Sequence, residues 1–289
     1  RSGHHRRAER MIYTRKSSGT LAVALVTEVF HDDPGGEVLR EHLREARDRG
    51  ADLAVLPELP LNGWAPATQI ARDEDAEPVD GPRQTALAQA AAHAGIAVLG
   101  GAIVVDADTG ERHNTALLYS ASGTCLARYR KIHLPEEAGY WETSHYKPGN
   151  AAPEIIEGLP LRLGLQICSD VNRPQGFQLL AAQGVEVVLA PRATPPETYE
   201  RWRMVLRANA IMSGAYLVSV NRPGPEGGAS IGGPSLAIAP TGEVLTETTD
   251  PVHVVTLERS AVAEASTEYP GYLKRFPEVY AKGWSGLDV

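Results

Sequence analysis

The chain has 289 residues, a mass of 31.0 kDa and a formal net charge of −8. Its 43% hydrophobic and 22% charged residues are ordinary for a globular protein that is long enough to bury a full core. The negative balance argues against a nucleic-acid-binding surface, and no apolar run approaches the ~20 residues of a membrane span. We therefore expect neither a nucleic acid nor a membrane as a partner.

Charge is distributed unevenly along the chain. Residues 1–16 hold six basic side chains against one acidic one, a net charge of +5. We expect residues 1–18 to form a basic arm, disordered or artificial, before a main domain over residues 19–258. The apolar stretch TLAVALV is interrupted soon afterwards by Glu28, so we interpret it as the first core strand rather than a secretory signal. The only cysteines, Cys125 and Cys168, are too few for a disulfide framework, which favours the cytoplasm.

The first half of the chain alternates strands with helices. Apolar periodicity and turn residues predict strands over 21–27, 52–56, 96–105, 115–120 and 124–129, and helices over 35–50 and 83–94. The connection over 60–82 is rich in Pro, Gly and Asn, and it is long enough to be functional. An irregular segment covers 131–160.

The second half repeats this order. It predicts strands over 161–167, 185–190 and 215–220, helices over 174–182 and 197–212, and closing strands that begin at 235, 244 and 252. Two halves of matching order predict an α/β fold with two sheets, each covered by helices on its outer face, as a four-layer α-β-β-α sandwich. The tail over 259–289 is rich in aromatic residues, so we expect it to lie at the interface of a homodimer or a larger homo-oligomer.

Three short segments at or just after strand ends carry candidate catalytic groups. LPELPLNGW contains Glu58, YRKIHLP contains Lys131, and QICSD contains Cys168. An attacking thiol needs a base to take its proton and a cation to stabilise the developing oxyanion, and these residue types fit the three roles. Each residue alone is also compatible with a non-catalytic role: Glu58 as a solvated loop acid, Lys131 as an exposed cation and Cys168 as a small buried side chain. His133 suggests a Cys–His pair, but we interpret it as structural or as part of a pocket wall.

The three segments in this order, together with GVEVVLAP and an N-T-A-L-L strand, resemble the nitrilase (carbon–nitrogen hydrolase) superfamily over about residues 21–257. The resemblance implies that Cys168 attacks an amide carbon, that Glu58 acts as general base and acid, and that Lys131 and the backbone N–H of Ser169 stabilise the oxyanion. The segment GYWETSHYKPG implies a second glutamate, Glu142, which orients Lys131 and the substrate amino group. Ammonia then leaves, and water hydrolyses the thioester. The resemblance implies no cofactor and no metal.

The residues around these segments indicate the kind of small-molecule substrate. We expect Trp64, Tyr140 and Trp141 to form walls of the site, which favours an apolar or uncharged group. Arg192 is a candidate clamp for a carboxylate. The nitrile-cleaving branch has Cys-Trp-Glu at the nucleophile, whereas this chain has Cys-Ser-Asp, so an amide is favoured.

Departures from the family pattern leave alternatives open. Val171 and Asn172 stand where relatives that cleave N-carbamoyl-D-amino acids have two arginines, and Gln175 stands where many relatives have glutamate. The loss of the glutamate carboxylate at Gln175 either changes the residues that surround the site or is compensated by the hydrogen bonds of the neutral glutamine side chain. The expected activity is hydrolysis of a small amide or an N-carbamoyl amine. The alternatives are nitrile hydrolysis, acyl transfer, ammonia supply from the same site, or an inactive nitrilase-like binding protein.

Overall fold

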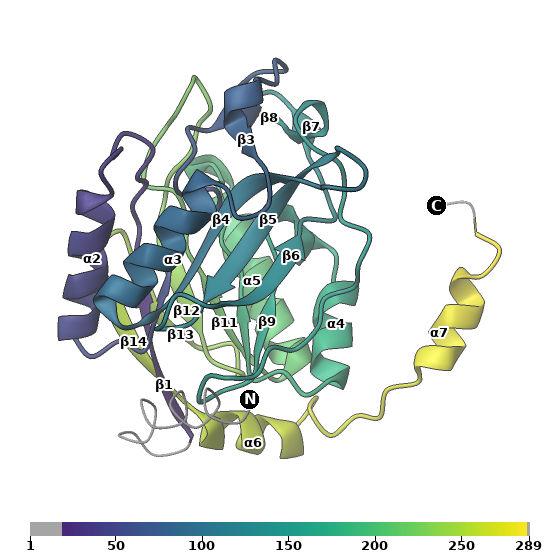
Figure 1. Cartoon of the computed structure of the whole chain (residues 1–289). Coiled ribbons are helices and arrows are strands. Elements are labelled where there is room, and N and C mark those ends of the chain that lie inside the picture. Colours follow the sequence, from purple (N-terminus) through teal and green to yellow (C-terminus); the bar gives the residue numbers. More distant parts are fainter. Residues whose placement is uncertain (1–18, 288–289) are drawn as a thin grey trace, which may run out of the picture.

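The computed structural model describes residues 19–287 and contains two stacked β-sheets (Figure 1). Within those residues, the first sheet has the strand order β14-β1-β2-β4-β5-β6, with β3 paired to β4, and the second has the order β13-β12-β11-β10-β9. The strands of the first sheet are β1 Thr20–Leu25, β2 Leu53–Val55, β3 Ala76–Glu77, β4 Ala97–Val105, β5 Arg112–Tyr119, β6 Cys125–Arg130 and β14 His253–Glu258. Those of the second are β9 Leu163–Leu165, β10 Val187–Leu189, β11 Tyr216–Ser219, β12 Ser235–Ile238 and β13 Val244–Thr248.

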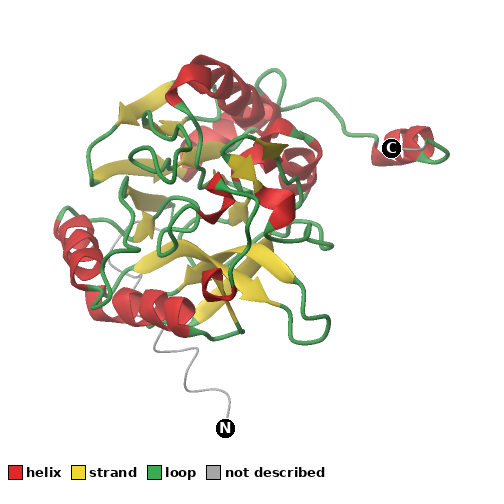
Figure 2. Cartoon of the chain, turned by 90° about the horizontal axis from the view of Figure 1, so that it is seen from above, coloured by secondary structure: helices red, strands yellow, loops and turns green. Residues whose placement is uncertain are grey.

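Helices cover the outer face of each sheet (Figures 1 and 2). Helices α2 Glu37–Asp48 and α3 Pro82–Ala94 pack on the first sheet, and α4 Gln175–Ala182 and α5 Tyr199–Ser213 pack on the second. Gly100 on β4 and Gly164 on β9 lie directly beneath leucines of α3 and α4, where an added Cβ would come within 2.7 Å of a leucine methyl group. The predicted four-layer α-β-β-α sandwich is therefore confirmed.

Alternating side chains explain why the strands read as nearly continuous apolar runs. On β1, Leu21 and Val23 face the second sheet, while Ala24 faces the outer helices. On β10, Val187 lies in the layer between the sheets and Val188 in the layer under α4 and α5. Because successive strand side chains point to opposite faces, a strand that is buried on both faces needs apolar residues at every position.

The structure differs from the sequence prediction in two segments and in the lengths of several strands. The segment over 131–160 is not wholly irregular, since it contains a small hairpin of β7 Glu136–Glu137 and β8 Tyr140–Trp141. The connection over 60–82 contains β3 and two short 3₁₀ helices. Several predicted strands are longer than the observed ones, because residues at their ends leave the hydrogen-bonded ladder while they remain buried. The predicted arm over residues 1–18 lies outside the described residues.

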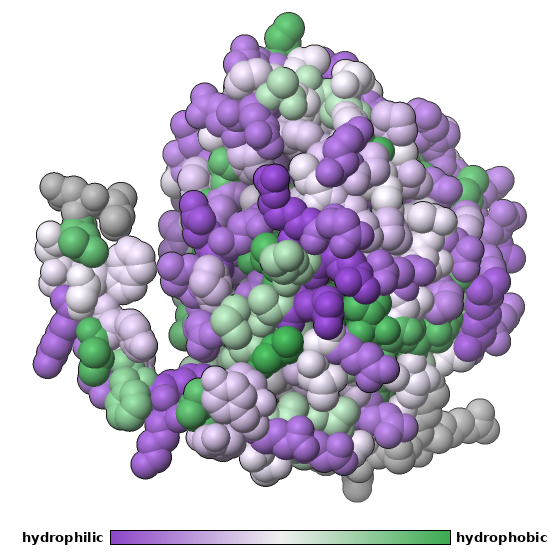
Figure 3. All heavy atoms as spheres, turned by 180° about the vertical axis from the view of Figure 1, so that it is seen from behind, coloured by the Kyte–Doolittle hydropathy of each residue, from purple (hydrophilic) through white to green (hydrophobic). Residues whose placement is uncertain are grey.

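The tail forms helices α6 Arg259–Thr267 and α7 Pro277–Trp284. Helix α6 lies against the body, whereas α7 stands away from it at the end of an extended connection (Figures 1 and 2). Phe276, Tyr280 and Trp284 are 53%, 70% and 51% exposed. Figure 3 shows apolar side chains both on this arm and on the nearby face of the body. No helix within residues 19–287 is long and apolar enough to cross a membrane.

Candidate functional site

The three predicted catalytic residues follow the carboxyl ends of strands in both sheets. Glu58 lies after β2, Lys131 directly follows β6, and Cys168 lies after β9. Strand β4 is parallel to β2, and β5 is antiparallel to both β4 and β6, so β2 and β6 run in the same direction. Glu58 and Lys131 therefore leave the first sheet at the same edge.

Lys131 lies at the centre of a buried ion cluster that also contains Glu58 and Glu142. Its Nζ atom donates to Glu58 Oε1 at 2.8 Å and to Glu142 Oε1 at 2.5 Å. The side chains of all three residues are at most 1% exposed. Asn114 on β5 adds an Nδ2 donor to the same oxygen of Glu58 at 2.8 Å. The structure thus brings together three of the four predicted catalytic residues by direct contacts.

Burial and mutual charge decide where the protons reside in this cluster. Burial alone would lower the pKa of Lys131, but the carboxylates of Glu142 and Glu58 outweigh it and raise that pKa above its usual value. Burial, reinforced by the Glu58 charge and opposed by Lys131, raises the pKa of Glu142 from 4.5 to about 8. One ammonium cannot neutralise two ionised carboxylates in a dry interior, so the cluster retains one additional proton near neutral pH.

Cys168 begins the 3₁₀ helix Cys168–Asn172 in a strained backbone conformation. Its φ angle is 45°, in the left-handed region that residues other than glycine rarely occupy. Its N–H donates to Pro191 O at 2.9 Å, and its Sγ atom lies 3.7 Å from Ala193 O. Burial, and then the charge of Glu58, raise the pKa of the thiol well above its usual value, with Lys131 opposing them. The resting group is therefore a thiol, which needs a base in order to react.

Ser169, the predicted source of the second oxyanion donor, is the next residue of this 3₁₀ helix. Its Oγ atom donates to His133 O, which ties the nucleophile segment to the segment that follows Lys131. Its backbone N–H lies in the first turn of the helix, where N–H groups have no partner within the helix.

Asp170 joins the segments that carry Cys168 and Lys131. It is fully buried, and its two carboxylate oxygens accept five hydrogen bonds. The donors are Tyr129 OH, the backbone N–H groups of Ile132, His133 and Ile167, and His133 Nδ1, at 2.8 to 3.2 Å. His133 is thus held by Asp170, in accord with the interpretation of this residue as structural.

A buried arginine supports the turn that carries Glu58. The guanidinium of Arg222 donates to the backbone oxygens of Glu58 at 2.9 Å, Leu59 at 2.8 Å and Asn62 at 3.0 Å. It also pairs with Glu226 at 2.6 Å. Leu59 has a φ of 50°, so Arg222 holds a turn whose backbone is itself strained.

Two acceptors in the ion cluster remain open. Among residues 19–287, the Oε2 atoms of Glu58 and Glu142 are buried without a hydrogen-bond partner. Buried polar atoms are normally paired, so these two oxygens are available for hydrogen bonds with a substrate or with water. In the same part of the chain, no group of three or more His, Cys, Asp or Glu side chains could hold a metal ion.

The predicted aromatic walls lie in two environments. The rings of Trp64 and Tyr140 pack edge to face at 6.0 Å, in an apolar cluster that includes Ala193, whose carbonyl lies against Cys168 Sγ. Trp141 is only partly buried and follows Tyr140 on β8, so its side chain points to the opposite face of that strand. The structure brings Trp64 and Tyr140 towards the site but does not bring Trp141 into this cluster.

Arg192, the candidate carboxylate clamp, is buried and bonded to its own chain. Its guanidinium donates to Ser219 Oγ at 3.0 Å, to Thr194 Oγ1 and to Pro234 O. Burial lowers the pKa of this guanidinium to about 10. A clamp should present unused donors, and the contacts of Arg192 instead support the strand ends behind Cys168.

Gln175, the departure from the family pattern, is the first residue of α4. It is exposed and lines an outer groove of the second sheet, together with Leu179 and Met212. It lies outside the buried ion cluster, so the replacement removes no carboxylate from that cluster.

Sequence reasoning missed Asn114, Asp170 and Arg222 as parts of the site. Asn114 is a buried polar residue on β5, just before the apolar part of that strand, and Arg222 follows the buried strand β11 closely. A charged residue placed just after a buried strand of an α/β sheet was the available signal.

Comparison with known proteins identifies the family of the chain. The sequence matches the carbon–nitrogen hydrolase family over residues 22–266. It is 33% identical to an (R)-stereoselective amidase of a Pseudomonas species over 228 residues, which cover 77% of this chain and 78% of that protein. Its structure is similar to that of an amidase from a Nesterenkonia species, with a TM-score of 0.75, 26% identity, and coverage of 93% and 98% of the two chains. A carbon–nitrogen hydrolase from Helicobacter pylori is similar in fold, with a TM-score of 0.80, 20% identity, and coverage of 91% and 98%. The chain therefore belongs to the carbon–nitrogen hydrolase family, the superfamily that its sequence resembles, and is an enzyme that acts on carbon–nitrogen bonds.

Proposed function

We propose that the protein hydrolyses the C–N bond of a small, uncharged amide or N-carbamoyl amine through a thioester on Cys168, with release of ammonia. The observation that carries the proposal is the buried Lys131 ammonium held between Glu58 and Glu142, in the electrostatic neighbourhood of Cys168. This arrangement supplies a nucleophile, a base and an oxyanion-stabilising cation. The relatives named above as amidases support the same chemistry.

The first half of the proposed reaction forms the thioester. Glu58 takes the Cys168 thiol proton as Sγ attacks the carbonyl carbon, and the negative charge moves to the carbonyl oxygen. Lys131 and the Ser169 N–H stabilise that oxyanion. The leaving nitrogen receives the proton from Glu58 and departs as ammonia when the C–N bond breaks.

The second half consumes water. Glu58 takes a proton from a water molecule, which attacks the thioester carbon, and Lys131 stabilises the second tetrahedral oxyanion. The C–S bond then breaks, and the Cys168 sulfur regains a proton from Glu58. For an amide, one amide and one water are consumed, and one carboxylic acid and one ammonia are formed. For an N-carbamoyl amine, the acid formed is a carbamic acid, which breaks down to the amine and CO2. In this scheme Glu142 keeps Lys131 in position through its Oε1 atom.

The surroundings of the cluster favour an uncharged substrate. Trp64 and Tyr140 offer apolar surface, while the guanidinium groups of Arg192 and Arg222 are committed to their own chain. A substrate carboxylate would therefore find no unused arginine among these residues. Amide N–H groups, by contrast, match the open Oε2 atom of the Glu58 carboxylate.

The test is a comparison of ammonia release from small primary amides, N-carbamoyl amines and the matching nitriles. We expect amides or carbamoyl amines to be hydrolysed faster than nitriles, and Cys168→Ala to abolish release. Cys125→Ala is the matched control and should keep full activity, since Cys125 lies on β6, away from the ion cluster, and its thiol donates to Ala127 O at 3.6 Å. Faster turnover of nitriles, or undiminished turnover by Cys168→Ala, would exclude the proposal.

A further inference from the structure

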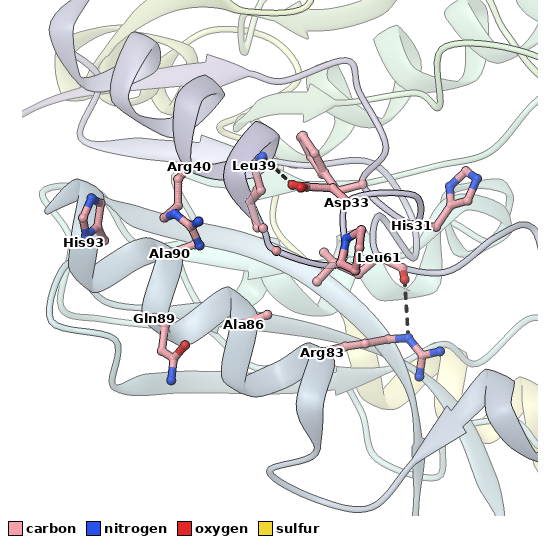
Figure 4. A pocket seen from close by; sticks show the side chains of 14 residues that line it. His31, Asp33, Leu39, Arg40, Leu61, Arg83, Ala86, Gln89, Ala90 and His93 are labelled. Carbon is pink, nitrogen blue, oxygen red and sulfur yellow. Dashed lines mark hydrogen bonds between the residues drawn. The ribbon is translucent and has the colours of Figure 1, made fainter.

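A second hollow lies on the outer face of the first sheet, between α2 and α3 (Figure 4). Its volume is about 670 Å³. Apolar side chains form part of its lining, namely Phe30, Leu39, Leu61, Ala86 and Ala90. Leu39 and Ala90 belong to the layer beneath the outer helices, whereas Cys168 belongs to the layer between the two sheets. The hollow is therefore separate from the catalytic site.

Solvent-accessible polar side chains border this apolar surface. Arg40 extends from α2 towards α3, on which Gln89 and His93 lie (Figure 4). Within the described part of the chain, the side chains of these three residues make no hydrogen bond and no ion pair. A guanidinium with unused donors beside apolar surface is a recognition group for a planar anion.

The charges along the rim favour an anion. The one acidic residue among those that line the hollow is Asp33, and both of its carboxylate oxygens accept N–H groups of α2, from Glu37 at 3.0 Å and from Leu39 at 3.1 Å. Arg83 is paired with the buried Glu77 at 3.4 Å, so among the described residues Arg40 is the lining cation without an ion pair.

We propose that this hollow binds a small organic monocarboxylate with a short apolar body. The carboxylate would pair with the Arg40 guanidinium and accept from Gln89 or His93, while the apolar body would cover Leu61 and Ala86. The proposal does not depend on the reaction at Cys168.

An occupant of the hollow would also touch the turn that carries Glu58. Leu61 is part of the lining, its carbonyl accepts from Arg83 Nε at 3.4 Å, and the neighbouring Pro60 O accepts from Phe30 N at 2.7 Å. Binding should therefore protect this turn from hydrogen exchange, together with the loop before α2. This gives a readout that is independent of catalysis.

The test uses phenylacetate as the probe and 2-phenylethanol as its neutral match, with calorimetry on the full chain carrying Cys168→Ala. We expect saturable binding of phenylacetate with a Kd on the order of 1 mM, and clearly weaker binding of the alcohol. Arg40→Glu should weaken binding at least tenfold. Arg44→Glu, one turn further along α2 and outside the lining, should leave it unchanged. Ala86→Phe should also abolish binding, because the ring fills the hollow without altering its charge.

Hydrogen–deuterium exchange with and without phenylacetate locates the bound probe. Protection should appear over residues 30–40, 58–64 and 83–93. Absence of saturable binding, equal affinity of the Arg40→Glu protein, or protection confined to residues 131–142 and 165–172 would each overturn the proposal.

Discussion

The proton held by the ion cluster gives the sharpest prediction, and Glu142→Gln is the variant that tests it. The Glu142 side chain is fully buried, and burial raises its pKa from 4.5 to about 8. An acid whose pKa is raised by folding stabilises the protein fully below its unfolded pKa, and this contribution is lost as the pH rises through the folded pKa. The glutamine side chain of the variant cannot titrate, so the variant escapes that loss.

The magnitude follows from the size of the pKa shift. The shift from 4.5 to about 8 spans several units, and each unit corresponds to ~1.4 kcal/mol. Between about pH 5.5 and pH 8, we therefore expect the free energy of unfolding of Glu142→Gln to rise relative to that of the wild type by on the order of 3 kcal/mol.

Urea unfolding at the two pH values, followed by tryptophan fluorescence, measures this difference. Glu136→Gln, an exposed carboxyl on β7, is the control and should show no such change with pH. A relative stability of Glu142→Gln that stays constant would refute the reasoning. A fall with rising pH would show that Glu142 behaves instead as an ordinary ionised partner of Lys131.

Four further outcomes follow from the site and the arm. Glu58→Gln should reduce kcat by at least a hundredfold in a steady-state ammonia assay, because no base remains for the thiol, and Glu142→Gln should be milder. Although the resting Cys168 is a buried thiol, Glu58 should take its proton as it attacks, so iodoacetamide should label Cys168 before Cys125 in peptide mapping, and loss of activity should follow the Cys168 label. Arg222→Lys should lower kcat while the fold is retained by circular dichroism, because an ammonium cannot replace the fork that reaches three carbonyls. Light scattering should show that the protein is at least a dimer. Deletion of residues 269–289 should shift the protein towards the monomer, because the aromatic side chains of this tail are exposed in the single chain and we expect a partner subunit to cover them.

The fold was predictable because its central strands are buried on both faces. Runs such as residues 187–190 are apolar at every position, and helices with an apolar stripe alternate with them, so layers and order can be derived from pattern alone. The ends of the strands could not be placed as well. Gln166 and Ile167 remain buried after β9 has left the ladder, and burial alone does not distinguish a strand from the turn that follows it.

The catalytic candidates could be predicted from their residue types and positions, whereas the residues that hold them in place could not. Glu58, Lys131 and Cys168 each stand at a strand end with a chemistry that needs the other two. Asp170 and Arg222 act through contacts with segments far away in the sequence, and no local pattern indicates such partners. The clamp predicted for Arg192 illustrates the same limit, because a strand-end arginine has the same local signature whether it faces a ligand or its own chain.

The central claim is that Cys168 becomes acylated during turnover. The most direct test is intact-protein and peptide mass spectrometry after rapid acid quench of the enzyme mixed with an excess of an amide that it hydrolyses. The account predicts a mass increase equal to the acyl group, located on the peptide that contains Cys168 and absent from Cys168→Ala. Ammonia release without any acyl adduct on Cys168, or an adduct on Cys125 alone, would contradict it.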